Sequence, residues 1–131
     1  MPTLYLIRGI PGAGKSSLAN LLRQQGIVDT VYEADNYFYD GFNYKFDPTK
    51  LKAAHESCQV QTSCDLLFGR NVAVSNTSVS ESEVQTYESM AIACKAKFIS
   101  IIVENRHGNS SIHNVPNEKI EQMKKRFSVK L

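Results

Sequence analysis

A glycine-rich segment near the start of the chain has the residue types and spacing of a phosphate-binding loop. Residues 9–16 read Gly-Ile-Pro-Gly-Ala-Gly-Lys-Ser and fit the pattern G-x-x-x-x-G-K-[ST]. The glycines let the backbone curl so that successive N–H groups point inward and form an anion nest. Lys15 is expected to reach the β- and γ-phosphates of ATP, and the Ser16 hydroxyl is expected to coordinate Mg²⁺. The residues predicted to contact the nucleotide are Gly9, Pro11, Gly12, Ala13, Gly14, Lys15, Ser16 and Ser17.

The segments on either side of this loop support the prediction. The apolar residues 4–7 read as a buried strand, and residues 17–22 carry leucines at helical spacing. A helix that begins near Lys15 adds free N–H groups and the positive end of its dipole to the phosphate site. A chance match in a glycine-rich turn is the alternative, and the strand before the loop and the helix after it argue against that alternative.

The rest of the chain alternates between strands and helices. The further strands are predicted at residues 31–34, 71–76 and 98–103. One helix is predicted from Asp47-Pro48 to Phe68, with Val60, Cys64, Leu67 and Phe68 on one face. A second follows the capping box of Ser80 and Glu83, and a third follows Pro116, with Ile120, Met123 and Phe127 facing inward. This alternation predicts a single α/β domain over residues 1–131, with a parallel sheet covered by helices on both faces.

An aspartate follows the second predicted strand, at the sheet edge where ligands of such folds bind. Asp35 is therefore expected beside the γ-phosphate. A carboxylate there has two chemical uses: it accepts the proton of an incoming hydroxyl group, or it orders the water shell of Mg²⁺. The alternative is a plain turn cap, a common role for aspartate. The strand-end position favours a functional role.

An amide follows the third predicted strand. Many P-loop proteins place a Mg²⁺-linked aspartate there, but this chain has Asn76, which hydrogen-bonds without carrying charge. The sequence therefore argues against a strongly hydrolytic ATPase motor.

A polar loop over residues 104–115 follows the fourth predicted strand, and its profile is that of a lid. Arg106 in this loop is predicted to neutralise charge on the transferring phosphoryl group; the alternative is a solvent-exposed loop charge. Arg8, just before the first glycine, is expected to make a structural pairing. Residues 36–46, which are aromatic and polar, are predicted to form a loop or a short irregular helix. The aromatic segment 37–46 is expected to serve either as a wall of an acceptor pocket or as a flap over the core.

Composition and charge set the remaining limits. The chain has 131 residues, enough for one domain with a core, and its net charge of +2 does not by itself indicate nucleic-acid binding. The three cysteines, Cys58, Cys64 and Cys94, are odd in number and lack a C-x-x-C pair, so we interpret them as small core residues in a reducing compartment. No leader pattern and no apolar run of membrane length is visible, and we therefore expect a cytoplasmic protein without a membrane partner.

Taken together, these motifs resemble the small polynucleotide-kinase-like P-loop phosphotransferases. That family includes the phage polynucleotide 5′-kinase domain and related domains fused to eukaryotic ubiquitin-ligase-binding proteins. The matching segments are residues 8–17, 33–38, 46–48 with Leu51 and 54–55, 74–77, and 112–116. The resemblance implies a three-layer α/β/α sandwich with the core strand order 2-3-1-4. It also implies ATP-dependent phosphorylation of a hydroxyl group, with Asp35 as the general base and arginines after the fourth strand over the phosphates.

The chain departs from the family at three positions. The arginine that grips the substrate phosphate in the polynucleotide kinases is replaced here by Phe38, the acid after the third strand by Asn76, and one lid arginine by Ser110. The nucleotide site and the base therefore carry over better than the nucleic-acid acceptor site. The short chain and its charge fit a small stand-alone kinase of phage type.

Two function classes follow from these observations. The first is a kinase that moves the γ-phosphate of ATP to a hydroxyl of a nucleotide, a nucleic-acid 5′ end or a related small molecule. The second is an ATP-binding switch or interaction module with little transfer activity, which Asn76 and Phe38 would allow. A nucleic-acid-binding protein that uses the basic C-terminal helix is a weaker third reading.

Overall fold

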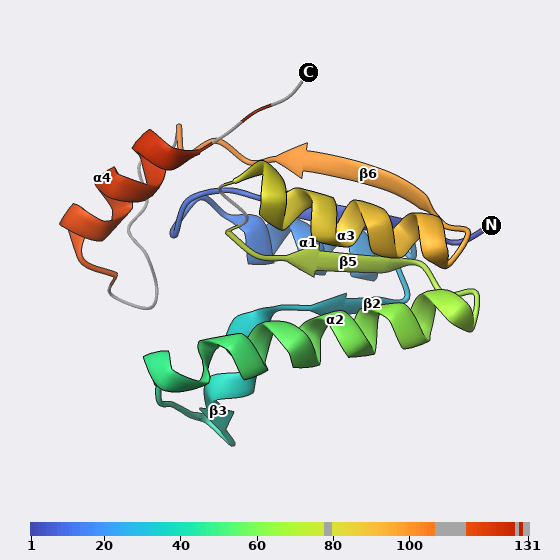
Figure 1. The fold of residues 1–131 in the computed structure, drawn as a ribbon, viewed down its shortest axis with the longest axis horizontal. Helices are drawn as coiled ribbons and strands as arrows, with labels where there is room; N and C mark the ends of the chain where they lie inside the picture. The colour runs from blue at the N-terminus through green and yellow to red at the C-terminus, as the bar shows by residue number, and fades with distance from the viewer. Residues whose placement is uncertain (78–79, 107–114, 128, 130–131) are drawn as a thin grey trace.

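A four-stranded parallel sheet forms the centre of the molecule. The computed structural model describes residues 1–77, 80–106, 115–127 and 129. The strands of the sheet are β1 (Thr3–Arg8), β2 (Thr30–Tyr32), β5 (Val72–Ser75) and β6 (Lys97–Ile102). They lie in the order β2-β5-β1-β6, and every pairing is parallel (Figure 1). In chain order this is the predicted arrangement 2-3-1-4, which is therefore confirmed.

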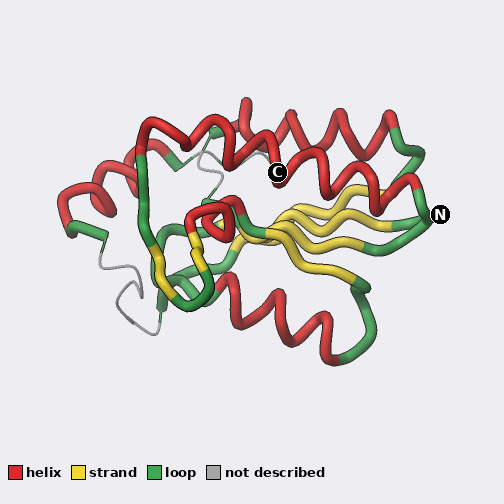
Figure 2. The backbone as a smooth tube through the Cα atoms, turned by 90° about the horizontal axis from the view of Figure 1, so that it is seen from below, coloured by secondary structure: helices red, strands yellow, loops and turns green. Residues whose placement is uncertain are grey.

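Helices cover both faces of this sheet. One face carries α1 (Lys15–Gln24), and the other carries α2 (Leu51–Leu67) and α3 (Glu81–Ala93), so that the sheet lies between two helical layers (Figure 2). The predicted three-layer α/β/α sandwich is confirmed. A fourth helix, α4 (Asn117–Arg126), lies to the side of the layers, beyond the carboxyl ends of the strands (Figure 1). No helix in the described ranges is both long enough and apolar enough to span a membrane.

The alternation of side chains along β1 explains the two layers. Leu4 and Leu6 are fully buried against residues of α2 and α3, while Ile7 packs on the opposite face against Ala19 of α1. Successive side chains of a strand point to opposite faces, so a strand buried on both sides reads as a continuous apolar run. The predicted strand at residues 4–7 is confirmed on this basis.

The predicted helix starts are also confirmed. The Asp47 side chain accepts a hydrogen bond from the backbone N–H of Thr49 at 2.9 Å, and Pro48 opens a short 3₁₀ turn, η2 (Pro48–Lys50), that leads into α2. Ser80 and Glu83 form the predicted capping box of α3. These caps supply partners for backbone N–H groups that the first helical turn leaves unpaired.

The apolar face predicted for the helix at residues 47–68 is not the buried face of α2. The four residues assigned to one face do share it, but that face points to solvent: Val60, Leu67 and Phe68 are 60%, 72% and 79% exposed, and Cys64 is exposed as well. The buried residues of α2 are Ala54, Cys58, Thr62, Asp65 and Leu66. Two of these are polar, so the apolar pattern of the sequence does not identify the buried face of this helix. The interpretation of Cys64 as a core residue was wrong, whereas Cys58 is buried and Cys94 is half-buried.

The aromatic segment contains an element that the sequence analysis missed. A 3₁₀ turn, η1 (Ala34–Phe38), matches the predicted irregular helix, but a two-stranded antiparallel hairpin follows it, formed by β3 (Tyr39–Asp40) and β4 (Asn43–Tyr44). Gly41 begins the two-residue loop of this hairpin with a φ of 63°, a conformation that glycine adopts without a steric penalty. An Asp-Gly pair between aromatic residues is the signal that could have predicted the hairpin.

Candidate active site

The phosphate-binding loop connects β1 to α1 and has the backbone that its sequence predicts. Gly12 and Gly14 have φ values of 86° and 100°, in the left-handed region that favours glycine. Gly14 occupies the N-cap of α1 without a side-chain cap, so the first N–H groups of the helix keep their capacity to bind an anion.

Gly9, the first glycine of the motif, is required for a different reason. A Cβ atom at this position would lie 2.8 Å from the carbonyl oxygen of Val103, closer than real Cβ contacts allow. The Gly9 N–H also donates to the carbonyl oxygen of Thr77 at 3.4 Å. Gly9 therefore lets the start of the loop pack against the segments that follow β5 and β6.

The Lys15 side chain folds over this loop. Its Nζ donates to the carbonyl oxygen of Ile10 at 3.1 Å. Burial lowers the pKa of Lys15, while the carboxylates of Glu33 and Asp35 act in the opposite direction. The structure therefore brings the lysine of the motif close to two carboxylates at the end of β2.

One of these two carboxylates is a residue that the sequence analysis missed. Glu33 follows β2 directly, and its carboxylate accepts a hydrogen bond from the Ser16 hydroxyl, the group predicted to coordinate Mg²⁺. The strand-end rule that selected Asp35 applies equally to Glu33, two residues earlier. A hydroxyl and a carboxylate are hard oxygen ligands of the kind that Mg²⁺ prefers, and one or two carboxylates plus phosphates suffice to bind it. The described residues contain no group of three or more His, Cys, Asp or Glu side chains placed to hold a metal.

Asp35 lies in the η1 turn, half-buried. The Tyr44 hydroxyl of the aromatic hairpin donates to the Asp35 carboxylate at 3.4 Å. Burial and the nearby Asp35 charge raise the pKa of Tyr44 to about 12, so that the phenol stays protonated and remains a donor at neutral pH. The hairpin therefore contacts the carboxylate predicted to be the general base.

The Asn76 side chain is hydrogen-bonded to the backbone of the η1 turn. This side chain is buried, and its Oδ1 accepts the backbone N–H of Ala34 at 2.9 Å. Its Nδ2 donates to the Tyr87 hydroxyl of α3 at 3.3 Å. The amide thus ties the end of β5 to the backbone next to Asp35, a role that requires both a donor and an acceptor and that a carboxylate would not fulfil.

The two arginines named from the sequence have different surroundings. Arg106 follows β6, its side chain is 86% exposed, and it pairs with Glu104. The remainder of the predicted lid, residues 107–114, lies outside the described residues. Arg8 is only 2% exposed and places its guanidinium 4.8 Å from the ring centre of Phe127, just after α4. This is a structural pairing, as expected. Ile120 and Met123 of α4 are half-buried, and no residue of that helix is fully buried.

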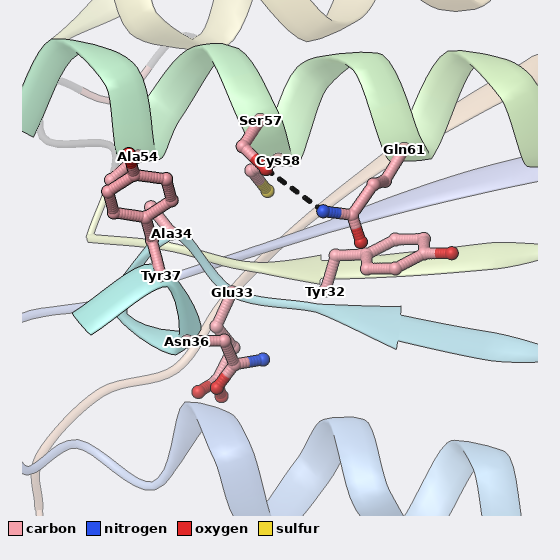
Figure 3. A pocket seen from close by; sticks show the side chains of 9 residues that line it. All are labelled: Tyr32, Glu33, Ala34, Asn36, Tyr37, Ala54, Ser57, Cys58 and Gln61. Atoms are coloured by element: carbon pink, nitrogen blue, oxygen red, sulfur yellow. Dashed lines mark hydrogen bonds between the residues drawn. The ribbon is translucent and has the colours of Figure 1, made fainter. Parts of the chain in front are cut away.

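A cavity of about 320 Å³ lies between the η1 turn and α2 (Figure 3). Tyr37 of the aromatic segment lines it, whereas Phe38 is buried in the core. The segment therefore provides a pocket wall and a core cover at once, which combines the two alternatives left open by the sequence.

Comparisons with known proteins agree with this geometry. No protein-family model matches the chain. Human NEDD4-binding protein 2 is 30% identical over 132 residues, which is 92% of this chain but only 7% of that protein. The chain thus corresponds to a small part of that relative.

Solved structures define the class of fold. The APS kinase CysC of Mycobacterium tuberculosis matches with a TM-score of 0.63 at 13% identity, covering 95% of this chain and 96% of that one. The Pnkp1/Rnl/Hen1 complex contains a chain that matches with a TM-score of 0.64 at 18% identity, covering 99% of this chain and 40% of that chain. The fold of this protein is therefore that of the P-loop kinases.

Proposed function

We propose that this protein is an ATP-dependent phosphotransferase that moves the γ-phosphate of ATP to a hydroxyl group. The observation that carries the proposal is the grouping of Lys15, Ser16, Glu33 and Asp35 at one edge of the sheet. A phosphate-binding loop alone indicates only a nucleoside triphosphate. Carboxylates beside its lysine and serine add the groups that phosphoryl transfer requires.

The reaction uses these side chains in distinct roles. The acceptor oxygen attacks the γ-phosphorus, the bond from that phosphorus to the β–γ bridging oxygen breaks, and ADP leaves. Asp35 takes the proton of the acceptor hydroxyl. Lys15, the loop N–H groups and Arg106 stabilise the charge on the phosphates.

The donor set also fits a magnesium ion. Ser16 and Glu33 would hold it, since their oxygens already lie in contact. Bound Mg²⁺ neutralises charge on the phosphate oxygens.

Our proposal also names the class of compound that accepts the phosphoryl group, which the fold alone does not determine. The similarity to a chain of the Pnkp1/Rnl/Hen1 RNA repair complex favours a polynucleotide-kinase-like enzyme that acts on a nucleotide, a nucleic-acid 5′ end or a related small molecule. The ordered set of motifs at residues 8–17, 33–38 and 74–77 supports the same choice.

The test is transfer of label from γ-labelled ATP to a panel of hydroxyl acceptors. The panel contains 5′-hydroxyl DNA and RNA, nucleosides and nucleoside monophosphates. Label in any acceptor, lost in Lys15→Ala, supports the proposal. ATP binding without transfer to any acceptor would instead favour a nucleotide-binding switch or interaction module.

A further inference from the structure

The cavity between η1 and α2 lies next to the proposed general base. Ala34 and Asn36, the two chain neighbours of Asp35, both line it. Its volume of about 320 Å³ is at the lower end of the range of small-molecule pockets, roughly 300–1,000 Å³. A cavity of this size takes one small ring-bearing molecule, or a single terminal unit of a larger one.

Two aromatic rings define the ends of this cavity. Tyr37 from η1 stands at one end and Tyr32 from β2 at the other, below the helix α2 (Figure 3). The Tyr32 hydroxyl already donates a hydrogen bond to the carboxylate of Asp65 at 2.5 Å, so its proton is not available to an occupant of the cavity. The two tyrosines therefore offer ring surface to an occupant, and aromatic surface of this kind favours a flat ring.

Polar groups of α2 form the wall above. Ser57, Cys58 and Gln61 all line the cavity, and the Gln61 Nε2 donates to the Ser57 hydroxyl at 3.0 Å (Figure 3). Burial raises the pKa of the Cys58 thiol, so this wall is uncharged at neutral pH. A small number of uncharged hydrogen-bonding groups among apolar ones is the usual means by which a pocket orients a neutral ligand.

The charge of the lining is unfavourable for an anion. The nine lining residues include one charged side chain, Glu33, and its carboxylate is directed to Ser16 at the phosphate-binding loop. A phosphate group placed in the cavity would lose hydration without gaining a cation from these residues. Asp35, two residues after Glu33 in the chain, adds further negative charge.

We propose that this cavity is the acceptor site and that it selects an uncharged, ring-bearing alcohol of nucleoside size over the same compound carrying a phosphate. The inference rests on the proposed phosphotransferase function. In the reaction, the bound alcohol gives its proton to Asp35, its oxygen bonds to the γ-phosphorus of ATP, and ADP leaves. The products are the phosphate monoester of that alcohol and ADP.

The experiment compares the four ribonucleosides with their 3′-monophosphates, which carry the same 5′-hydroxyl group. With γ-labelled ATP, kcat/KM for at least one nucleoside is expected to exceed that of its 3′-monophosphate by about 10-fold or more, equivalent to about 1.4 kcal/mol. A matched pair of variants on α2 locates the effect. Gln61→Arg puts a cation into the cavity wall and is expected to reduce this preference by about 10-fold, whereas Gln59→Arg, on the same helix but not in the lining, leaves the preference unchanged.

ATP affinity and the circular dichroism spectrum of both variants confirm that they fold. Equal or better use of the 3′-monophosphates, an unchanged preference in Gln61→Arg, or transfer only to acceptors outside the nucleosides would overturn the acceptor site and leave the phosphotransferase intact. Absence of transfer to every acceptor, 5′-hydroxyl oligonucleotides included, would overturn the proposed function and this inference with it.

Discussion

Two carboxylates at the end of β2 lie two residues apart and have different partners. Glu33 accepts the Ser16 hydroxyl at the phosphate-binding loop, and Asp35 accepts the Tyr44 hydroxyl of the aromatic hairpin. One carboxylate thus contacts the predicted metal ligand, and the other contacts the hairpin that follows η1. This division predicts different phenotypes for substitutions that remove only the charge.

For Asp35→Asn we expect phosphoryl transfer to fall by about 10²–10⁴-fold, the usual contribution of a general base. ATP affinity should stay nearly unchanged, because the phosphate-binding loop supplies it. Asparagine has the same shape and still hydrogen-bonds, but it cannot take the proton. Single-turnover kinetics and calorimetry measure the two quantities. Loss of metal-dependent affinity with partial rescue by extra Mg²⁺ would identify a metal organiser, and no change in either quantity would identify a turn cap.

For Glu33→Gln we expect the opposite pattern. The glutamine still accepts the Ser16 hydroxyl, but the negative charge is lost. We expect affinity for Mg²⁺ in the presence of ATP to fall by about 10–100-fold. Titration with Mn²⁺, followed by electron paramagnetic resonance, measures this without relying on turnover. Glu56→Gln, the same change at an exposed position of α2, is the control. Equal metal affinity in both variants would remove Glu33 from the metal site.

At the scale of elements, β2 is held by a polar network centred on one buried carboxylate of α2. Asp65 accepts the hydroxyls of Thr30 and Tyr32 at 2.9 and 2.5 Å and pairs with Arg70 at 2.9 Å. Burial acts to raise the pKa of Asp65, but the hydrogen bonds from Tyr32, Thr30 and Arg70 outweigh it, and the pKa is lowered. This edge strand, which positions Glu33 and Asp35, thus depends on a charged group of the helix beside it.

The stability effect of this network is testable. Asp65→Ala removes the carboxylate that accepts hydrogen bonds from the Thr30 and Tyr32 hydroxyls. The free energy of unfolding should fall by about 1–3 kcal/mol as a result. Because the folded-state pKa is lowered, the stabilisation is complete above the ordinary value of about 3.9 and is lost as the pH falls through the folded-state pKa. Urea unfolding of wild type and Asp65→Asn between pH 7 and about pH 2 measures it. The free energy of unfolding of Asp65→Asn should depend less on pH in the acid range than that of the wild type. Identical pH profiles for the two proteins would contradict the role of the network. Glu88→Gln, a change at an exposed position of α3, is the control.

The same network shows where sequence reasoning succeeds and fails. The phosphate-binding loop, the helix caps and the place of Asp35 after β2 follow from local patterns, because short-range sterics and the strand-end rule determine them. The strand order was predicted only through the family resemblance, because local patterns do not determine which strands pair. The inward face of α2 does not follow from local patterns either, because the burial of Asp65 on that face depends on partners in β2, far away in the chain. Thr62 donates to a carbonyl of its own helix, but Asp65 needs residues of β2 and Arg70. The strand-end rule that selected Asp35 could also have predicted Glu33. The Asp40-Gly41 pair could have predicted the hairpin.

At the scale of the whole molecule, the proposed nucleotide site is built from elements that contact the helices on both faces of the sheet. The loop belongs to β1 and α1 on one side, while Asn76 and the η1 turn connect the same edge to α2 and α3 on the other. A ligand that binds only the folded state stabilises it by RT ln(1 + [L]/Kd), about 2.7 kcal/mol when its concentration is 100 times Kd. ATP with Mg²⁺ should therefore raise the melting temperature of the entire domain.

For a chain of 131 residues we expect this shift to be on the order of 10 °C at that saturation. Lys15→Ala should abolish most of the shift, because it removes the cation that lies over the loop, while the melting temperature without ATP should change little. Scanning calorimetry with and without ATP and Mg²⁺ measures both, and Lys52→Ala, at an exposed position of α2, is the matched control. A shift that persists in Lys15→Ala would place ATP outside the phosphate-binding loop. A wild-type protein with no shift at saturating ATP would remove the nucleotide site on which the proposed reaction depends.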